Sequence, residues 1–169
     1  MVLFVAMVEM VAEAGNQSTV DSELESVSLI MPTNSRPEFV RQALRQIAKQ
    51  EYPRELLREL IVVDDSPLEL RRLTGLMEGQ QPLPFMNVVY VALDRQWSIG
   101  AKRNLAVSQA TGSVIVHWDD DDWYSTSRLR MQLKPIAEGK AELTLLEHSL
   151  ALFLPDGKLI RAAHSRRAS

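Results

Sequence analysis

The chain has 169 residues, of which 46% are hydrophobic, 24% charged and 6% aromatic, as in an ordinary globular protein. It contains no cysteine, which excludes disulfides, thiolate zinc sites, iron–sulfur clusters and cysteine nucleophiles, and permits a reducing compartment. Its formal net charge of −3 lacks the basic excess that binding to nucleic-acid phosphates needs, so we expect no nucleic-acid partner.

The first 26 residues are predicted to form an acidic N-terminal extension. Five Asp and Glu side chains, and no Lys or Arg, precede Arg36. The apolar run at residues 1–8 has no basic flank and is much shorter than the roughly 20 apolar residues of a membrane span. We therefore expect neither a signal peptide nor an anchor, and a cytoplasmic location. A helix is expected over residues 2–14, ended by Gly15, with a polar linker from residue 16 to residue 26.

From residue 27 onward, apolar segments of strand length alternate with amphipathic segments of helical length. Strands are expected at residues 27–31, 60–63, 87–93 and 113–118. Helices are expected at residues 37–47, from the Ser66-Pro67 pair to Gly75 or Gly79, at residues 100–110, and at residues 125–137 with Gly139 as the stop. Residues 141–154 and 159–162 are expected to form a hairpin.

This alternation predicts an α/β fold with a mostly parallel, Rossmann-like sheet covered by helices on both faces. The domain is expected over residues 27–163, followed by a tail over residues 164–169. Ligands of such sheets bind beyond the carboxyl ends of the strands. The segments that follow the expected strands there are residues 32–36, 64–66, 94–97 and 119–122, and three of the four contain aspartate.

Four consecutive aspartates, Asp119 to Asp122, are the sharpest of these signals. Two carboxylates about 4 Å apart repel by about 4 kcal/mol at an effective dielectric constant near 20, so such a cluster favours a bound cation. Ligands that are all oxygen select Mg²⁺ or Mn²⁺, ions that also bind phosphate oxygens. The alternative is that one aspartate caps the next helix. Because Ser125 and Ser127 are nearer caps, capping explains at most one of the four.

Two further groups of charged residues follow predicted strands or begin a predicted helix. Asp64 and Asp65 either contribute to a ligand site or only favour the N-terminal dipole of the next helix. Lys102 and Arg103 lie in the first turn of a helix, where cations oppose the dipole, and an anionic ligand explains them better than helix stability does. With Arg36, they supply positive charge suited to a diphosphate.

Four segments in order resemble the motifs of family 2 glycosyltransferases with the GT-A fold. They are residues 27–36 (VSLIMPTNSR), 61–66 (IVVDDS), 99–106 (IGAKRNLA) and 117–124 (HWDDDDWY). The resemblance implies a nucleotide-diphosphate-sugar donor, commonly a UDP-sugar, and a Mn²⁺ or Mg²⁺ ion. It implies Asp121 and Asp119 as metal ligands, with Asp65 against the base. The donor-binding residues that it implies are Pro32, Thr33, Asn34, Arg36, Asp64, Asp65, Lys102, Arg103, Asp119 and Asp120.

The chain departs from the family pattern after residue 124. Family members continue into an acceptor half that carries a general-base carboxylate, often in a Glu-Asp pair. Here 45 residues follow Tyr124. Their acidic side chains, none in that setting, are Glu138, Glu142, Glu147 and Asp156. We therefore expect the donor-binding half of such an enzyme, with the acceptor half missing and no general base assigned.

Three functions follow from these features. The first is metal-dependent transfer of a sugar from the nucleotide donor to an acceptor hydroxyl. The second is a non-catalytic nucleotide-sugar-binding remnant. The third is a receiver-type phosphotransfer domain with Asp94 as phosphoacceptor, which leaves the four aspartates unexplained. If the acceptor half is missing, apolar side chains of the hairpin should be exposed, namely Leu143, Leu145, Leu150, Leu152 and Phe153.

Overall fold

The computed structural model describes residues 2–6, 24–76, 81–146, 148–153 and 158–163. Its elements are, in chain order, β1 (Val2–Ala6), β2 (Val27–Thr33), α1 (Pro37–Ile47), η2 (Arg54–Leu56), β3 (Leu57–Asp64), α2 (Leu68–Arg72), β4 (Asn87–Ala92), α3 (Ile99–Gln109), β5 (Val114–His117), β6 (Asp122–Tyr124), α4 (Arg128–Ala137), β7 (His148–Phe153) and β8 (Lys158–Ala163). Among the described residues, no helix has the length and apolar character needed to cross a bilayer.

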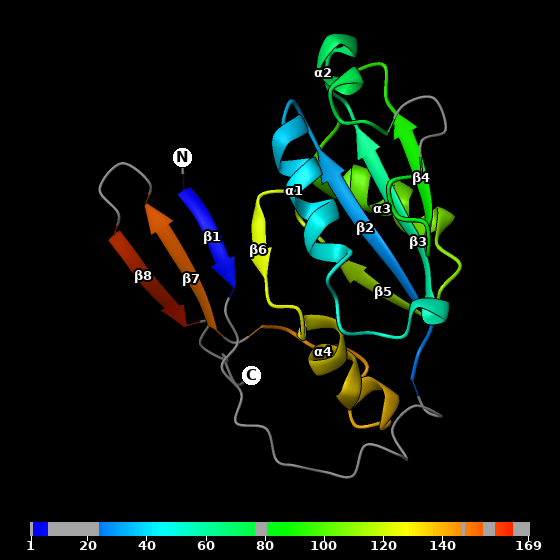
Figure 1. Ribbon diagram of the computed structural model, residues 1–169, viewed down its shortest axis with the longest axis vertical. Coiled ribbons are helices and arrows are strands. Elements are labelled where there is room, and N and C mark those ends of the chain that lie inside the picture. The colour runs from blue at the N-terminus through cyan, green and yellow to red at the C-terminus, as the bar shows by residue number, and fades with distance from the viewer. Residues whose placement is uncertain (1, 7–23, 77–80, 147, 154–157, 164–169) are drawn as a thin grey trace.

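The larger layer of the fold is a four-stranded sheet in the order β4-β3-β2-β5, with every neighbouring pair parallel. Alternate residues of its central strands enter two separate apolar clusters. Leu29 and Met31 of β2 pack in the cluster that includes Val40 and Leu44 of α1. Ile30 of β2 packs in the cluster that includes α3. Helices therefore cover both faces, with α1 in front of the sheet and α3 behind it in the view of Figure 1. The predicted parallel α/β sheet is confirmed.

The second sheet has the order β6-β1-β7-β8, in which β1 runs parallel to β6 and antiparallel to β7. The helix predicted over residues 2–14 is therefore wrong for residues 2–6, which form β1, and its remainder lies outside the described residues. β-branched and aromatic side chains dominate this stretch, and pairing with two strands distant in sequence decides its conformation. The predicted hairpin is confirmed as β7 and β8, but it begins at residue 148 instead of 141.

Helix starts differ from the sequence expectations in two places. Helix α2 begins at Leu68 without a side-chain cap: the Ser66 oxygen accepts from the Ser35 N–H, and its hydroxyl donates to the buried Asp64 carboxylate. Helix α4 begins at Arg128 instead of residue 125, and its N-cap residue Ser127 makes no capping hydrogen bond. The expected end of α4 is confirmed, since Gly139 follows it with a φ of +66°.

Candidate functional site

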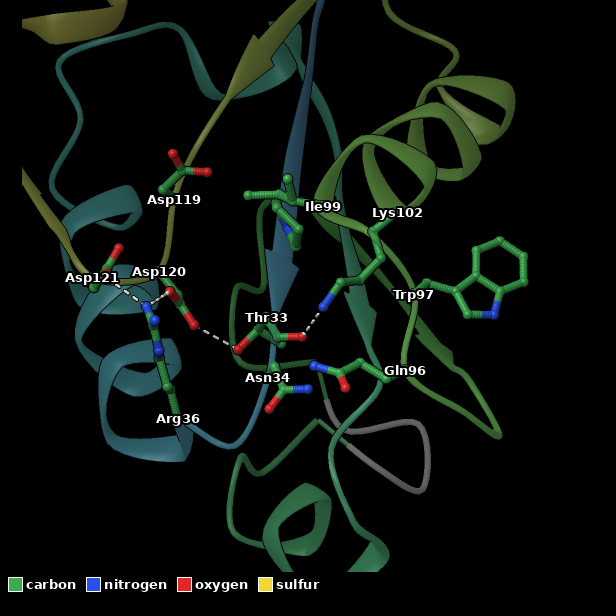
Figure 2. A pocket seen from close by; sticks show the side chains of 11 residues that line it. Thr33, Asn34, Arg36, Gln96, Trp97, Ile99, Lys102, Asp119, Asp120 and Asp121 are labelled. Carbon is green, nitrogen blue, oxygen red and sulfur yellow. Dashed lines mark hydrogen bonds and ion pairs between the residues drawn. The ribbon is translucent and has the colours of Figure 1, made fainter.

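A cavity of about 320 Å³ opens at the carboxyl edge of the parallel sheet. Its walls come from the end of β2, the segment after β4, the first turn of α3 and the loop after β5, as Figure 2 shows. The residues that line it are Pro32, Thr33, Asn34, Arg36, Gln96, Trp97, Ile99, Lys102, Asp119, Asp120 and Asp121. The site therefore lies where the strand ends of an α/β sheet predict one.

One wall of the cavity rests on a buried ion pair. Lys102 is 6% exposed, and its Nζ lies 2.7 Å from Oδ1 of Asp65 and 2.9 Å from the backbone oxygen of Thr33. The same Oδ1 accepts a 2.6 Å hydrogen bond from Asn34 Nδ2, and Oδ2 accepts one of 2.8 Å from the backbone N–H of Trp97. Burial alone would raise the pKa of Asp65, but these donors outweigh it and hold that pKa below its ordinary value. Asp65 is therefore a fixed, charged anchor behind the cavity.

The opposite wall carries three of the four consecutive aspartates. Asp120 is 3% exposed and accepts a 2.5 Å hydrogen bond from the Thr33 hydroxyl. Burial raises the pKa of Asp120 to about 6, although Thr33 and Arg36 favour its charged form. The side chains of Asp119 and Asp121 are about one-third exposed. This wall presents oxygen ligands to the cavity.

Cations of the chain partner these aspartates. Nη1 of Arg36 lies 3.3 Å from Oδ1 of Asp120 and also donates to Oδ2 of Asp121, so one nitrogen bridges two carboxylates (Figure 2). Nη2 of Arg103 lies 2.9 and 3.1 Å from the two carboxylate oxygens of Asp119. The positive charges in the first turn of α3 are thus balanced by the chain's own carboxylates, and no anionic ligand is needed to explain them. Arg103 itself does not line the cavity.

The fourth aspartate, Asp122, does not line the cavity and makes a hydrogen bond within the fold instead. Asp122 begins β6 and accepts a 2.6 Å hydrogen bond from the Tyr124 hydroxyl. Burial raises the pKa of Asp122, and the bond from Tyr124 partly offsets this. The Arg128 guanidinium stacks on the rings of Tyr124 and Trp118, with its Cζ 3.6 and 4.8 Å from their centroids. One aspartate of the run is therefore structural, although it caps no helix.

Asp64 does not contact the cavity, contrary to its expected donor-binding role. It is 1% exposed, and its carboxylate accepts hydrogen bonds from the Ser66 N–H at 2.8 Å and the Tyr90 hydroxyl at 2.6 Å. The Ser66 oxygen in turn accepts a 2.6 Å hydrogen bond from the backbone N–H of Ser35, whose φ is +56°. Asp64 thus fixes the turn that separates Asn34 from Arg36. Its carboxylate is buried at the strand end, which its position in the sequence does not reveal.

Three residues that line the cavity were absent from both the expected donor-binding and the expected metal-ligand residues: Gln96, Trp97 and Ile99. They lie between β4 and the first turn of α3. The strand-end rule does point to residues 94–97, but this segment carries no repeated or paired charge that would single out particular side chains. Ile99 offers no chemical signal at all, because an apolar residue at a helix start is ordinarily a packing residue.

Among the described residues, no three or more acidic or histidine side chains converge as a ready metal site. The carboxylates of Asp120 and Asp121 do, however, already share one cationic group, Nη1 of Arg36. Mg²⁺ in proteins is often held by one or two carboxylates, with phosphate oxygens and waters completing its shell. The oxygen donors present therefore fit a hard divalent cation bound together with a phosphate ligand.

Acidic residues after β6 lie away from this cavity wherever the structure describes them. Glu138 pairs with Lys140 at 2.8 Å on the surface, and Glu142 is exposed. Glu147 and Asp156 lie outside the described residues. In the part of the chain that the structure describes, the carboxylates that line the cavity are those of Asp119, Asp120 and Asp121.

The chain is similar in sequence to two curated proteins, both named as glycosyltransferases. The chain is 30% identical over 110 residues to WcaA of Escherichia coli (strain K12), which is named for glycosyl transfer in colanic acid biosynthesis. It is 25% identical over 120 residues to the poly(ribitol-phosphate) β-N-acetylglucosaminyltransferase TarS of Staphylococcus aureus. These matches cover 63% and 71% of this chain, which spans 36% and 20% of the two relatives.

Solved structures show the same fold. The crystal structure of S. aureus TarS 1–349 in complex with UDP-GlcNAc superposes with a TM-score of 0.56 and 26% identity, covering 67% of this chain and 31% of that one. The mannosyltransferase PcManGT from Pyrobaculum calidifontis, in complex with GDP-Man and Mn²⁺, gives a TM-score of 0.54 at 24% identity, covering 68% and 32%. The family model described as "Glycosyl transferase family 2" matches residues 28–148. With its GT-A-type parallel sheet and its strand-end site, the chain belongs to glycosyl transferase family 2.

Proposed function

We propose that the cavity binds a nucleoside-diphosphate sugar, with uridine as the nucleoside, and that the chain contributes this site to transfer of the sugar to an acceptor hydroxyl. The observation that carries the proposal is that one cavity has two opposite walls with different charged residues. One wall is anchored by Asp65 and Lys102, and the other carries Asp119 to Asp121 with Arg36. The UDP-GlcNAc complex of TarS, a relative of the same fold, supports the choice of donor class.

The proposed roles follow from the contacts of each side chain. Asn34 lines the cavity and donates to Asp65, which is buried behind the wall, so this pair suits recognition of a base. Arg36 is half exposed and suits the diphosphate, because a guanidinium offers a fork of donors to phosphate oxygens. We assign Asp121 and Asp119 as ligands of Mn²⁺ or Mg²⁺, since both carboxylates are accessible. Such an ion offsets negative charge on a leaving diphosphate.

A second candidate is a nucleotide-sugar-binding protein without turnover. It is favoured by one specific observation, namely that the cavity-lining carboxylates of the described residues all belong to the aspartate run. A general base for the acceptor hydroxyl contributes typically ~10²–10⁴-fold to rate. Turnover with a radiolabelled UDP-sugar and a panel of acceptors separates the two candidates. The family match over residues 28–148 contradicts the receiver-type alternative.

Donor binding is testable by calorimetry and thermal unfolding. With Mn²⁺ present, UDP at about 100 times its dissociation constant should stabilise the chain by roughly 2.7 kcal/mol, a shift of several degrees in Tm. Asp121→Asn should remove the metal-dependent part of that shift. Asp94→Asn, an exposed carboxylate outside the cavity, is the matched control and should retain it. Absence of Mn²⁺-dependent UDP binding by the folded wild-type chain would refute the donor-site proposal.

A further inference from the structure

Arg36, which we propose contacts the diphosphate, has a fixed backbone and a half-exposed side chain. It precedes the first turn of α1, and its backbone is fixed on both sides: its C=O accepts from Val40 N–H at 3.1 Å, and the preceding Ser35 N–H bonds to Ser66. Its side chain is 47% exposed. The guanidinium is therefore attached to a rigid point but has solvent around it. It can change its partner without moving the main chain.

The other two cations of the site are held differently. Lys102 is buried and neutralises Asp65 behind the wall, and Arg103 is paired with both oxygens of Asp119. Arg36 instead uses a single nitrogen, Nη1, to contact two carboxylates, those of Asp120 and Asp121. Asp121 is also one of the two proposed ligands of the divalent ion. Arg36 therefore occupies a carboxylate that the ion needs.

We propose that Arg36 is an internal counter-cation of the donor site: it neutralises Asp120 and Asp121 while the site is empty, competes with the divalent ion for the carboxylate of Asp121, and turns to the diphosphate when the ion binds. The inference rests on the proposed function and adds a coupling to it. Without nucleotide, the ion must displace Arg36 and leave its charge unpaired. With nucleotide, the released guanidinium gains phosphate oxygens as partners. Ion and nucleotide should therefore bind cooperatively, through one side chain.

The test measures Mn²⁺ binding without nucleotide, by titration followed by electron paramagnetic resonance. Arg36→Gln should bind Mn²⁺ about three- to fivefold more tightly than wild type, the scale of a half-exposed ion pair. Arg36→Lys keeps the charge and should stay within about twofold of wild type. Arg41→Gln is the matched control: it removes the same charge from the helix that follows Arg36, where Arg41 pairs with Glu38, and should leave Mn²⁺ affinity unchanged.

A second arm measures UDP binding at saturating Mn²⁺ by calorimetry. Arg36→Gln should now bind the nucleotide more weakly, so one substitution changes the two affinities in opposite directions. Equal or weaker Mn²⁺ binding by Arg36→Gln, or no Mn²⁺ binding by either protein, would overturn the inference. A gain in Mn²⁺ affinity equal to that of Arg41→Gln would also overturn it, because it would reflect net charge alone. If Arg36→Gln binds Mn²⁺ more tightly but wild type binds no UDP, the counter-cation role stands and the donor proposal fails.

Discussion

Asp65 and Asp120 are both nearly buried beside the same cavity, yet their pKa values shift in opposite directions. Burial by itself would raise the pKa of both carboxyls, and the other groups around each one decide the direction of the shift. Asp65 is surrounded by donors from Lys102, Asn34 and the Trp97 backbone, which stabilise its charge. Asp120 has one hydroxyl, a longer contact to Arg36 and the repulsion of neighbouring aspartates. The number of donors around a carboxylate, more than its depth, sets its charge state here.

The raised pKa of Asp120 predicts a pH dependence of stability. Between its ordinary value of 3.8 and its folded value of about 6, the folded chain binds more protons than the unfolded chain, so this carboxyl lowers the unfolding free energy as pH rises. Asp120→Asn removes that contribution. The variant should gain about 1–3 kcal/mol relative to wild type between pH 4 and pH 8, measured by urea denaturation without metal or nucleotide.

The control for this comparison is Asp94→Asn, which alters an exposed carboxylate after β4. Its unfolding free energy should follow the wild-type pH profile. If the unfolding free energies of wild type and Asp120→Asn change with pH in parallel, ionisation of Asp120 does not cost stability in the folded chain, and the prediction is wrong.

At the level of elements, two glutamines, Gln46 of α1 and Gln50 just after that helix, fix the segment that follows the aspartate run. Nε2 of Gln46 donates to the Asp122 carbonyl at 3.2 Å, and its Oε1 accepts from the Tyr124 N–H at 2.8 Å. One turn later, Gln50 makes the same pair of bonds to the Ser125 carbonyl, at 2.8 Å, and the Leu129 N–H, at 3.2 Å. The Gln46 amide thus pairs with β6 as a neighbouring strand would, and the Gln50 amide joins the residue after β6 to the first turn of α4. They hold the loop that presents the cavity carboxylates.

Gln46→Leu should therefore destabilise the fold and the site together. It leaves a buried N–H and a carbonyl without partners, which costs about 1–3 kcal/mol by denaturant unfolding. Gln42→Leu, one turn earlier on α1, is the matched control. Its Nε2 is buried and has no hydrogen-bond partner among the described residues, so its loss should be neutral or slightly stabilising. Equal costs for the two variants would contradict this role of Gln46.

The elements that could be predicted from the sequence are those specified by local pattern. The run of β-branched residues in β3 and the apolar stripe of α1 each bury a continuous face, so periodicity identifies them. Strands β1 and β6 could not be identified in this way. β6 has three residues, and β1 is defined by partners more than 100 residues away in the chain. Cap residues failed for a related reason, since the Ser66 oxygen accepts from the Ser35 N–H, a partner distant in sequence, and not from a helix N–H.

The charged residues of the site could be predicted from the sequence, because they occur in runs directly after predicted strands or at the start of a predicted helix. The runs that contain Asp65, Lys102 and Asp120 come together at one sheet edge because parallel strands end there. The family resemblance named Asp119, Asp120 and Asp121, which line the cavity, but the run alone gives no signal of direction because its residues are identical. Asp64 and Asp122 are directed into the fold by hydroxyl partners, Tyr90 and Tyr124, that only the folded chain supplies.

Across the whole molecule, the connection between α4 and β7 leaves apolar side chains in solvent. Leu143 is 73% exposed and Leu145 is 81% exposed, as expected from the sequence; the side chains of Leu150, Leu152 and Phe153 are not among those described. We predict that Leu143→Glu/Leu145→Glu lowers self-association in static light scattering without changing Mn²⁺-dependent UDP binding, because neither residue lines the cavity. Unchanged scattering would show that these leucines are not association sites.

Strand β6 is an edge strand of the second sheet and lies between β1 and α1 (Figure 1). Its backbone amides can therefore be used to follow how this part of the fold is held together. Its three residues pair with β1 on one edge, and the Tyr124 N–H on the other edge is held by Gln46. A strand this short is not stable without its neighbours. Amide hydrogen exchange at Tyr124 should therefore require loss of the Gln46 bond, and it should become faster if the pairing of β6 with β1 is lost. A single resonance, followed in deuterated buffer, measures how firmly α1 holds the segment that follows Asp120.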